Sequence, residues 1–186
     1  EVSLRADIFD ITTGVPDVDG SPVTPGEQFA ALLGDPLHRQ PDGAVALPFS
    51  LSAFEHALFS SALCDDRIEE IEVKLVGDYL GDREAEVWLT RQGLAGVRRC
   101  DGADLPDWSA YVPYSFEREQ VVIQAGAGDF GTAGPNSGYA AWPVHGEQWT
   151  LTIPPPGKAP ANLDLDLRHV SDVVLRLRHR AGSIAP

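Results

Sequence analysis

Residues 71–75 read IEVKL and residues 85–90 read AEVWLT, so apolar and polar side chains alternate in both stretches. Because the side chains of a β-strand point alternately to opposite faces, such a stretch buries one face and leaves the other in water. Further stretches of strand character lie at 119–123, 148–153, 163–167 and 173–178. We therefore predict six strands and a mainly β chain.

Glycine, proline, aspartate and asparagine separate these strands, and no long helical pattern lies between them. Parallel strands need a crossover connection, usually a helix, so a parallel βαβ fold is excluded. The pattern favours an antiparallel β-sandwich, jelly-roll-like, with one or two short N-terminal helices. We divide the chain into an N-terminal extended segment, residues 1–24, and a β-sandwich domain, residues 25–186.

The stretch TPGEQFAALLGDP, residues 24–36, predicts a short helix. Thr24 is placed to cap it, Pro25 suits the first helical position, and Glu27 completes a capping box. Gly34 then ends the helix. A second Ser-x-x-Glu pattern at residues 52–55 predicts another short helix that runs to about residue 61.

The stretch VVIQAGAGDFG, residues 121–131, contains the GxGxxG spacing of a dinucleotide-binding turn. That motif requires a helix to begin at its third glycine, because the helix N-terminus holds the pyrophosphate. Gly131 is instead followed by TAGPNSG, whose glycines and proline specify turns. We interpret the motif as a glycine-rich loop after a strand, and we predict no cofactor.

The 186 residues carry a formal net charge of -14. Such a surface repels nucleic-acid phosphates and anionic lipid, so we expect neither nucleic acid nor membrane as a partner. No apolar run is long enough to span a bilayer. The chain begins at Glu1 and contains no methionine, so we expect a domain excised from a longer protein.

Residue patterns for metal binding and catalysis are missing from the sequence. Cys64 and Cys100 are too few for a zinc site, and the histidines lack H-x-x-x-H or H-x-H spacing. Ser171 and Asp172 lie near His169, but adjacent strand residues point to opposite faces and cannot converge on one reacting atom. We predict no metal and no enzyme. For the cysteines we favour two unrelated buried thiols over a disulfide.

Trp142 and Trp149 raise the question of carbohydrate binding as an alternative function. Trp149 has the parity of Leu151 and Ile153, which places it in the core. Trp142 lies in a loop with Tyr139 nearby, and an exposed aromatic pair is typical of a sugar-stacking surface. Tyr139 and Trp142 are therefore the contact residues of an alternative hypothesis, a carbohydrate-binding β-sandwich.

Two C-terminal stretches, GYAAWPVHGEQWTLTIPPP (138–156) and LDLRHVSDVVLRLRHRA (165–181), resemble the C-terminal end of the large A component of bacterial toxin complexes, the Tc toxins. The residues that match this family's pattern are Pro143, Gly146, Trp149, Leu151, Pro154, Val170, Ser171, Asp172, Val173, Leu175, Arg178 and Ala181. Upstream, residues 25–36, 47–59 and 67–81 follow the same order of segments. The chain departs from the pattern at Val144 and His145, where Phe-Glu is common, and at His179, where tyrosine is common.

The resemblance implies a β-sandwich at the end of a much larger, pentameric chain, after its translocation channel. It implies a secreted, non-catalytic docking module that binds the B–C cocoon component and neighbouring copies of itself. A structural assembly domain of a related secreted machine is the remaining hypothesis. Residues 1–24 match no part of the family.

The strand at 173–178 is suited to a sheet edge. Val173, Leu175 and Leu177 can face inward, while Arg176, Arg178 and Arg180 project outward as a candidate interface with a neighbouring copy. Arginines on an edge also block unwanted strand pairing and then need no partner.

Overall fold

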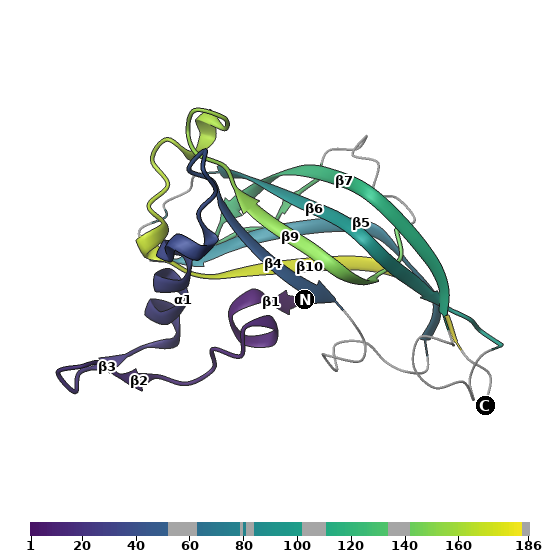
Figure 1. Cartoon of the computed structure of the whole chain (residues 1–186), viewed down its shortest axis with the longest axis horizontal. Helices are drawn as coiled ribbons and strands as arrows, with labels where there is room; N and C mark the ends of the chain where they lie inside the picture. The colour runs from purple at the N-terminus through teal and green to yellow at the C-terminus, as the bar shows by residue number, and fades with distance from the viewer. Residues whose placement is uncertain (52–62, 79, 81–83, 102–110, 134–141, 184–186) are drawn as a thin grey trace.

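The computed structural model describes residues 1–51, 63–78, 80, 84–101, 111–133 and 142–183. Strands from these residues form one curled sheet in the order β1-β10-β5-β7-β6-β9-β4, with β8 paired to β5 off this path (Figure 1). The strands are β1 (Val2–Ser3), β4 (Val45–Leu51), β5 (Leu63–Gly77), β6 (Glu84–Arg98), β7 (Tyr111–Ala127), β8 (Gly131–Thr132), β9 (His145–Ile153) and β10 (Val170–Ser183).

Two antiparallel groups of strands make up this sheet. β10 pairs with β5, and β7, β6, β9 and β4 pair in turn. The groups meet in a parallel pairing of β5 with β7 at only two positions, Lys74–Gly126 and Leu75–Ala127. Val73 of β5 and Leu89 of β6 are both 0% exposed and belong to one apolar core. The mainly β, sandwich-like fold is confirmed.

Helix α1 spans Pro25–Gly34 and begins and ends as predicted. The Glu27 N–H donates to Thr24 Oγ1 at 3.2 Å, and the Thr24 N–H donates to the Glu27 carboxylate at 2.7 Å. The helix packs closely on β10, because a Cβ placed on Gly26 would lie 2.8 Å from the Ser171 Cβ. The helix predicted near residues 52–61 lies outside the described residues.

The N-terminal residues are only partly extended. After β1, residues Leu4–Ile8 form a π-helical turn, η1, where we predicted extended chain. The Ser3 hydroxyl caps this turn by accepting the Ala6 N–H at 2.8 Å. Leu4 is 0% exposed, so this segment contributes to the core.

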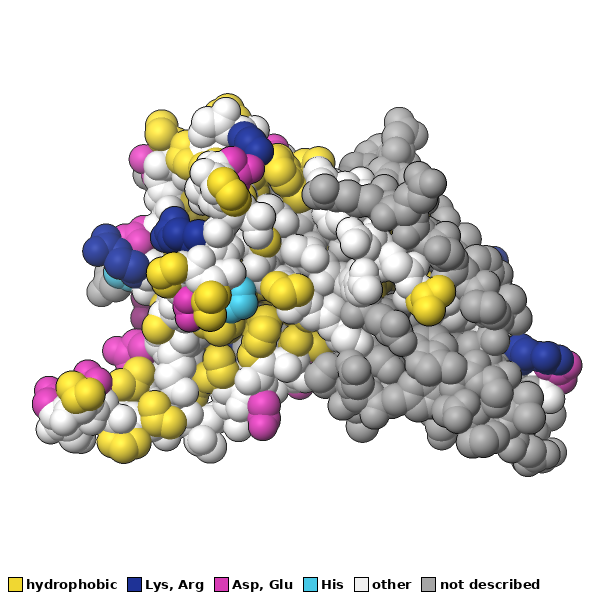
Figure 2. All heavy atoms as spheres, in the orientation of Figure 1, with side chains coloured by type: hydrophobic (Ala, Val, Ile, Leu, Met, Phe, Trp, Pro, Cys, Tyr) yellow, Lys and Arg dark blue, Asp and Glu magenta, His cyan; other side chains and the backbone are white. Residues whose placement is uncertain are grey.

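A small hairpin of β2 (Val15–Pro16) and β3 (Pro22–Val23) follows η1. It extends away from the sheet beside α1 (Figure 1). In the space-filling view its tip carries apolar and acidic side chains (Figure 2). Val18 at the tip is fully exposed.

The strand predicted at residues 163–167 is wrong. The chain turns there between two short 3-10 helices, η4 (Pro160–Asn162) and η5 (Leu167–His169). The Asp166 carboxylate caps η5 by accepting the Arg168 N–H at 3.0 Å. Aspartate favours such local bonds over a strand ladder, so the alternation of leucine and aspartate reflects turns.

The glycine-rich stretch after residue 125 is a tight turn, as interpreted. Gly128 has φ +88°, and a Cβ on Gly131 would lie 1.4 Å from the Gln124 carbonyl oxygen. The chain thus folds back on β7 so closely that only glycine fits, and β8 then pairs with β5.

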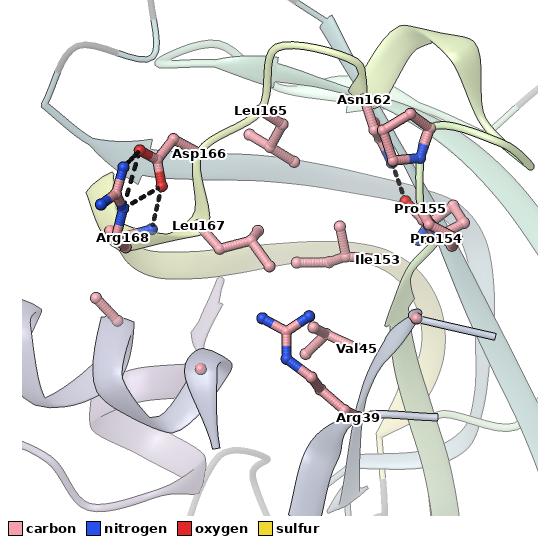
Figure 3. A pocket seen from close by; sticks show the side chains of 14 residues that line it. Arg39, Val45, Ile153, Pro154, Pro155, Asn162, Leu165, Asp166, Leu167 and Arg168 are labelled. Carbon is pink, nitrogen blue, oxygen red and sulfur yellow. Dashed lines mark hydrogen bonds and ion pairs between the residues drawn. The ribbon is translucent and has the colours of Figure 1, made fainter. Parts of the chain in front are cut away.

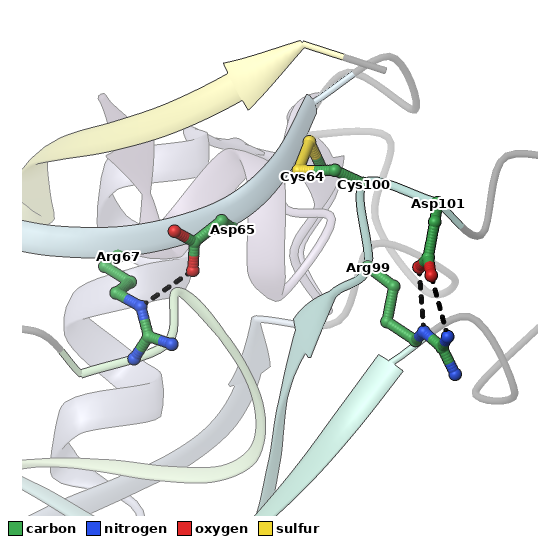
Figure 4. Close-up of a disulfide and its surroundings, with 6 residues drawn as sticks. All are labelled: Cys64, Asp65, Arg67, Arg99, Cys100 and Asp101. Atoms are coloured by element: carbon green, nitrogen blue, oxygen red, sulfur yellow. Dashed lines mark hydrogen bonds and ion pairs between the residues drawn. A yellow bond between two sulfur atoms is a disulfide. The ribbon is translucent and has the colours of Figure 1, made fainter. Parts of the chain in front are cut away.

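Cys64 and Cys100 form a disulfide, so the prediction of two unrelated thiols is wrong (Figure 4). The bond joins the start of β5 to the turn after β6, and the two Cα atoms lie 5.0 Å apart. Ion pairs flank it on both sides, Arg67–Asp65 within β5 and Arg99–Asp101 just after β6. Thirty-six residues separate the cysteines, and only the fold brings their backbones together.

Replacing both cysteines by serine should lower the free energy of unfolding by about 4 kcal/mol, because the bond closes a long loop in the unfolded chain. Urea unfolding of the oxidised chain and the double variant measures this difference. Titration of the denatured, unreduced chain should detect no free thiol. Two free thiols would contradict the pairing.

Candidate functional site

A pocket of about 420 Å³ opens where α1, the start of β4, the end of β9 and the 154–168 segment meet (Figure 3). Its walls are largely apolar and include Val45, Ile153, Leu165 and Leu167. The Arg39 side chain extends from below toward these apolar residues. The site therefore combines apolar surface with a cation.

Arg39 is exposed, and no ion pair or side-chain hydrogen bond joins its guanidinium to another described residue. On the opposite wall, Arg168 is already paired with Asp166, with Nη2–Oδ2 at 2.6 Å. The hydrogen bonds from the Arg168 side chain and its backbone N–H lower the pKa of Asp166 to about 2. Arg39 is thus the cation in this pocket that remains available to an anionic group.

Asn162 holds the upper wall of the pocket in place. It is 4% exposed, and its amide group donates to the carbonyl oxygens of Pro154 (2.8 Å) and Glu86 (2.9 Å). Its side-chain oxygen accepts the Glu86 N–H at 2.8 Å. One buried amide therefore ties the 154–168 segment to the beginning of β6.

A buried polar cluster is centred on the middle of β6. Arg91 is 1% exposed, and its guanidinium donates to the carbonyl oxygens of Pro143 and His145. Its Cζ lies 4.9 Å from the centre of the Trp149 ring and 5.8 Å from that of Trp142. Cations are attracted to the faces of such rings.

Asp66 of β5 joins the same cluster and is 0% exposed. Its Oδ1 forms a short hydrogen bond with His179 Nδ1, and its Oδ2 lies 3.8 Å from His145 Nε2. Burial raises the pKa of Asp66. Burial also lowers the pKa of His145 to about 4, helped by the positive charges of His179, Arg91 and Arg98.

Residues that match the toxin-complex pattern occupy mainly structural positions. Trp149, Leu151, Val173 and Leu175 are 0% exposed. Pro143 and Pro154 offer their carbonyl oxygens to Arg91 and Asn162, and Gly146 pairs in register with both neighbouring strands.

Asp172 and Ser171 belong to the same pattern and connect β10 to other segments. The Asp172 carboxylate accepts the Ser3 hydroxyl (2.6 Å), the Arg5 N–H (3.0 Å) and its neighbour Val173's N–H (2.7 Å). The Ser171 hydroxyl donates to the Val76 carbonyl oxygen at 3.1 Å. These side chains therefore hold the N-terminus and β5 on β10.

The candidate interface arginines differ in their contacts. Arg176 pairs with Glu1 (2.7 Å) and Glu72 (3.2 Å), and its Cζ lies 3.7 Å from the centre of the Phe130 ring. It is thus held by three residues of its own chain.

Arg178 pairs with Glu70 at 3.1 Å, whereas Arg180 is exposed and lies opposite Arg67 in the strand register. In the described part of the chain, only β1 pairs with the outer edge of β10, at Val174 and Leu175. The register of β10 against β5 shifts at three places, and such bulges discourage a further strand from adding.

The proposed sugar contact at Trp142 is contradicted. Trp142 is 5% exposed and packs against Trp149 with ring centres 5.9 Å apart. Its indole faces the Arg91 guanidinium and offers no open surface to a sugar. Tyr139 lies outside the described residues. The core position predicted for Trp149 is confirmed.

Within the described ranges, no group of three or more His, Cys, Asp or Glu side chains is placed to hold a metal ion. The same part of the chain contains no helix whose length and apolarity would suffice to cross a bilayer.

Neither a protein-family model nor a curated protein matches this chain. Among solved structures, it is similar to a chain in the cryo-EM structure of Yersinia pseudotuberculosis TcaA-TcaB, with 17% sequence identity and a TM-score of 0.42. The likeness covers 96% of this chain and 9% of that chain.

Acid should destabilise the protein through His145. The pKa of His145 is about 4 in the folded protein and about 6.5 in the unfolded chain. Between pH 6.5 and pH 4 the unfolded chain is therefore protonated at His145 while the folded protein is not, which favours unfolding. At about pH 4.5 this one group should cost roughly 2 to 3 kcal/mol relative to neutral pH. Asp66, whose pKa is raised, opposes the loss in part.

Urea unfolding of the wild type and of His145→Gln at about pH 7 and pH 4.5 measures this contribution, because groups distant from residue 145 titrate alike in both chains. We expect the variant to lose roughly 2 kcal/mol less than the wild type on acidification. An equal loss in both chains would contradict the assignment to His145.

Proposed function

We propose that this chain is a non-catalytic docking and assembly module of a secreted bacterial toxin complex, and that its partner is the B–C cocoon component. The resemblance of residues 25–182 to the end of the Tc toxin A component supports this function. So does the contrast between the pattern residues, most of which are buried, and a pocket that opens an exposed arginine to solvent.

The pocket containing Arg39 is the observation that carries the proposal. Arginine beside apolar surface is typical of the positions that dominate protein interfaces. Because the Arg39 guanidinium is uncommitted among the described residues, it can pair with a partner carboxylate. The pocket thus suits a protein segment with an apolar side chain next to an aspartate or glutamate.

The edge of β10 is the weaker candidate surface. Arg176 and Arg178 are already paired with carboxylates of their own chain, and exposed pairs of this kind contribute little. The bulges of β10 further favour edge protection over pairing with a neighbouring copy.

Binding of the full-length parent to the purified cocoon component tests this function. We expect the wild type to bind and Arg39→Glu to weaken binding by at least about tenfold, because it places a carboxylate where a partner carboxylate should pair. Biolayer interferometry measures both affinities.

Two charge-matched variants serve as controls. Arg99→Glu lies just after the end of β6, outside the lining of the Arg39 pocket, and should bind like the wild type. Arg180→Glu tests the β10 edge. A wild-type parent that fails to bind the cocoon component would overturn the function. Loss of binding in Arg180→Glu, with Arg39→Glu unaffected, would move the docking surface to the edge.

A related secreted machine could use the same module with a different partner. The Arg39 pocket would then bind an acidic-apolar segment of that partner, and affinity purification of the full-length parent with its own secreted proteins would identify it.

A further inference from the structure

The outer face of strands β4, β9 and β6 carries an open groove of about 390 Å³. Trp88 and Thr90 of β6 line it together with Thr152 of β9. At one end the groove meets a second hollow of about 460 Å³, and the two share Gln92 and Thr150. Together they form an elongated surface.

Strand register places these side chains on one face. Trp88 lies directly opposite Thr152, and Thr90 lies opposite Thr150. Their neighbour Leu89 is 0% exposed and points to the core. The groove is therefore built on regular, paired strands, which hold its side chains at fixed positions.

The two charged side chains that line the groove pair with each other, and the nearby Glu86 carboxylate is held by hydrogen bonds. Lys158 forms an ion pair with Asp42 at one end. The Glu86 carboxylate accepts the Trp88 Nε1–H at 2.7 Å and the Gln124 amide at 3.3 Å. In a chain of net charge -14, this surface offers mainly hydroxyl and amide groups beside an indole.

The indole is held in one orientation at the surface, and a buried threonine hydroxyl lies beside it. The bond from Trp88 Nε1 to Glu86 fixes the orientation of a ring that is only partly buried. Thr90 is 6% exposed, and its hydroxyl has no hydrogen-bond partner in the described part of the chain. A buried polar group without a partner is uncommon in folded proteins.

We propose that this groove binds a neutral oligosaccharide. The C–H face of a sugar ring stacks on the Trp88 indole, and threonine and glutamine side chains bond to the sugar hydroxyls. A neutral, extended ligand with many hydroxyl groups matches both the lining and the length of the surface. The site is distinct from the Arg39 pocket and independent of the docking function.

Native gel electrophoresis of this chain in gels that contain a soluble neutral polysaccharide tests the proposal. The probes are glycogen, laminarin, galactomannan and xylan, with anionic alginate as the charged comparison. The net charge of -14 drives the chain into the gel, so binding appears as retardation. We expect at least one neutral polysaccharide to retard the wild type, with no weakening by added salt.

Trp88→Ala should weaken this binding at least about tenfold. Thr152→Val, which removes a hydroxyl and keeps the side-chain shape, should weaken it about three- to tenfold. Leu94→Ala is the matched control, since Leu94 is 56% exposed on the same strand and does not line the groove. Thermal unfolding verifies that each variant is folded.

Failure of every neutral polysaccharide to retard the wild type would overturn the proposal, as would retardation by alginate alone. Retardation of a folded Trp88→Ala variant equal to that of the wild type would also overturn it. Should Trp88→Ala not fold, Thr152→Val decides, and unchanged binding in that variant would count against the groove.

Discussion

A buried guanidinium is the interaction on which much of this structure depends. Burying a cation costs several kcal/mol unless its donors are satisfied. Arg91 meets much of that requirement, because its Nη1 and Nη2 donate to the Pro143 and His145 carbonyl oxygens and its guanidinium lies against two indole rings. The segment that carries these carbonyls can then take one path across β6, because any other path would leave the charge without acceptors.

Residues 142–146, which Arg91 holds in place, connect the two groups of strands. The Ile68 N–H donates to the Trp142 carbonyl oxygen, and the Val144 N–H donates to that of Asp66, so the segment bridges to β5 before it enters β9. Two other buried side chains also join segments by hydrogen bonds. The Asp172 carboxylate binds the N-terminal residues to β10, and the Asn162 amide binds the 154–168 segment to β6. The Arg39 pocket and the Trp88 groove open to solvent on this internally held framework.

Periodicity predicted much of this arrangement. Val87, Leu89 and Arg91 are two residues apart along β6, so their side chains point to the same face of the strand. The strand pattern therefore made the burial of Arg91 foreseeable, although its charge argued against it. β4 was missed although its apolar residues alternate, because the proline at Pro48 argues against a strand, and a proline is tolerated there since β4 lies at the sheet edge. Trp88 alternates with the buried Val87 and Leu89 and so lies on the outer face, but the groove depends on three paired strands and was not visible from one. The Cys64–Cys100 bond likewise depends on tertiary contact.

Urea unfolding of Arg91→Lys and Arg91→Met tests most directly whether the guanidinium fixes the 142–146 segment. Lysine keeps the charge but cannot donate to both carbonyl oxygens in the fork geometry of arginine, and methionine removes charge and donors together. We predict that each variant loses about 2 to 4 kcal/mol of unfolding free energy. A methionine variant within about 0.5 kcal/mol of the wild type would contradict the account.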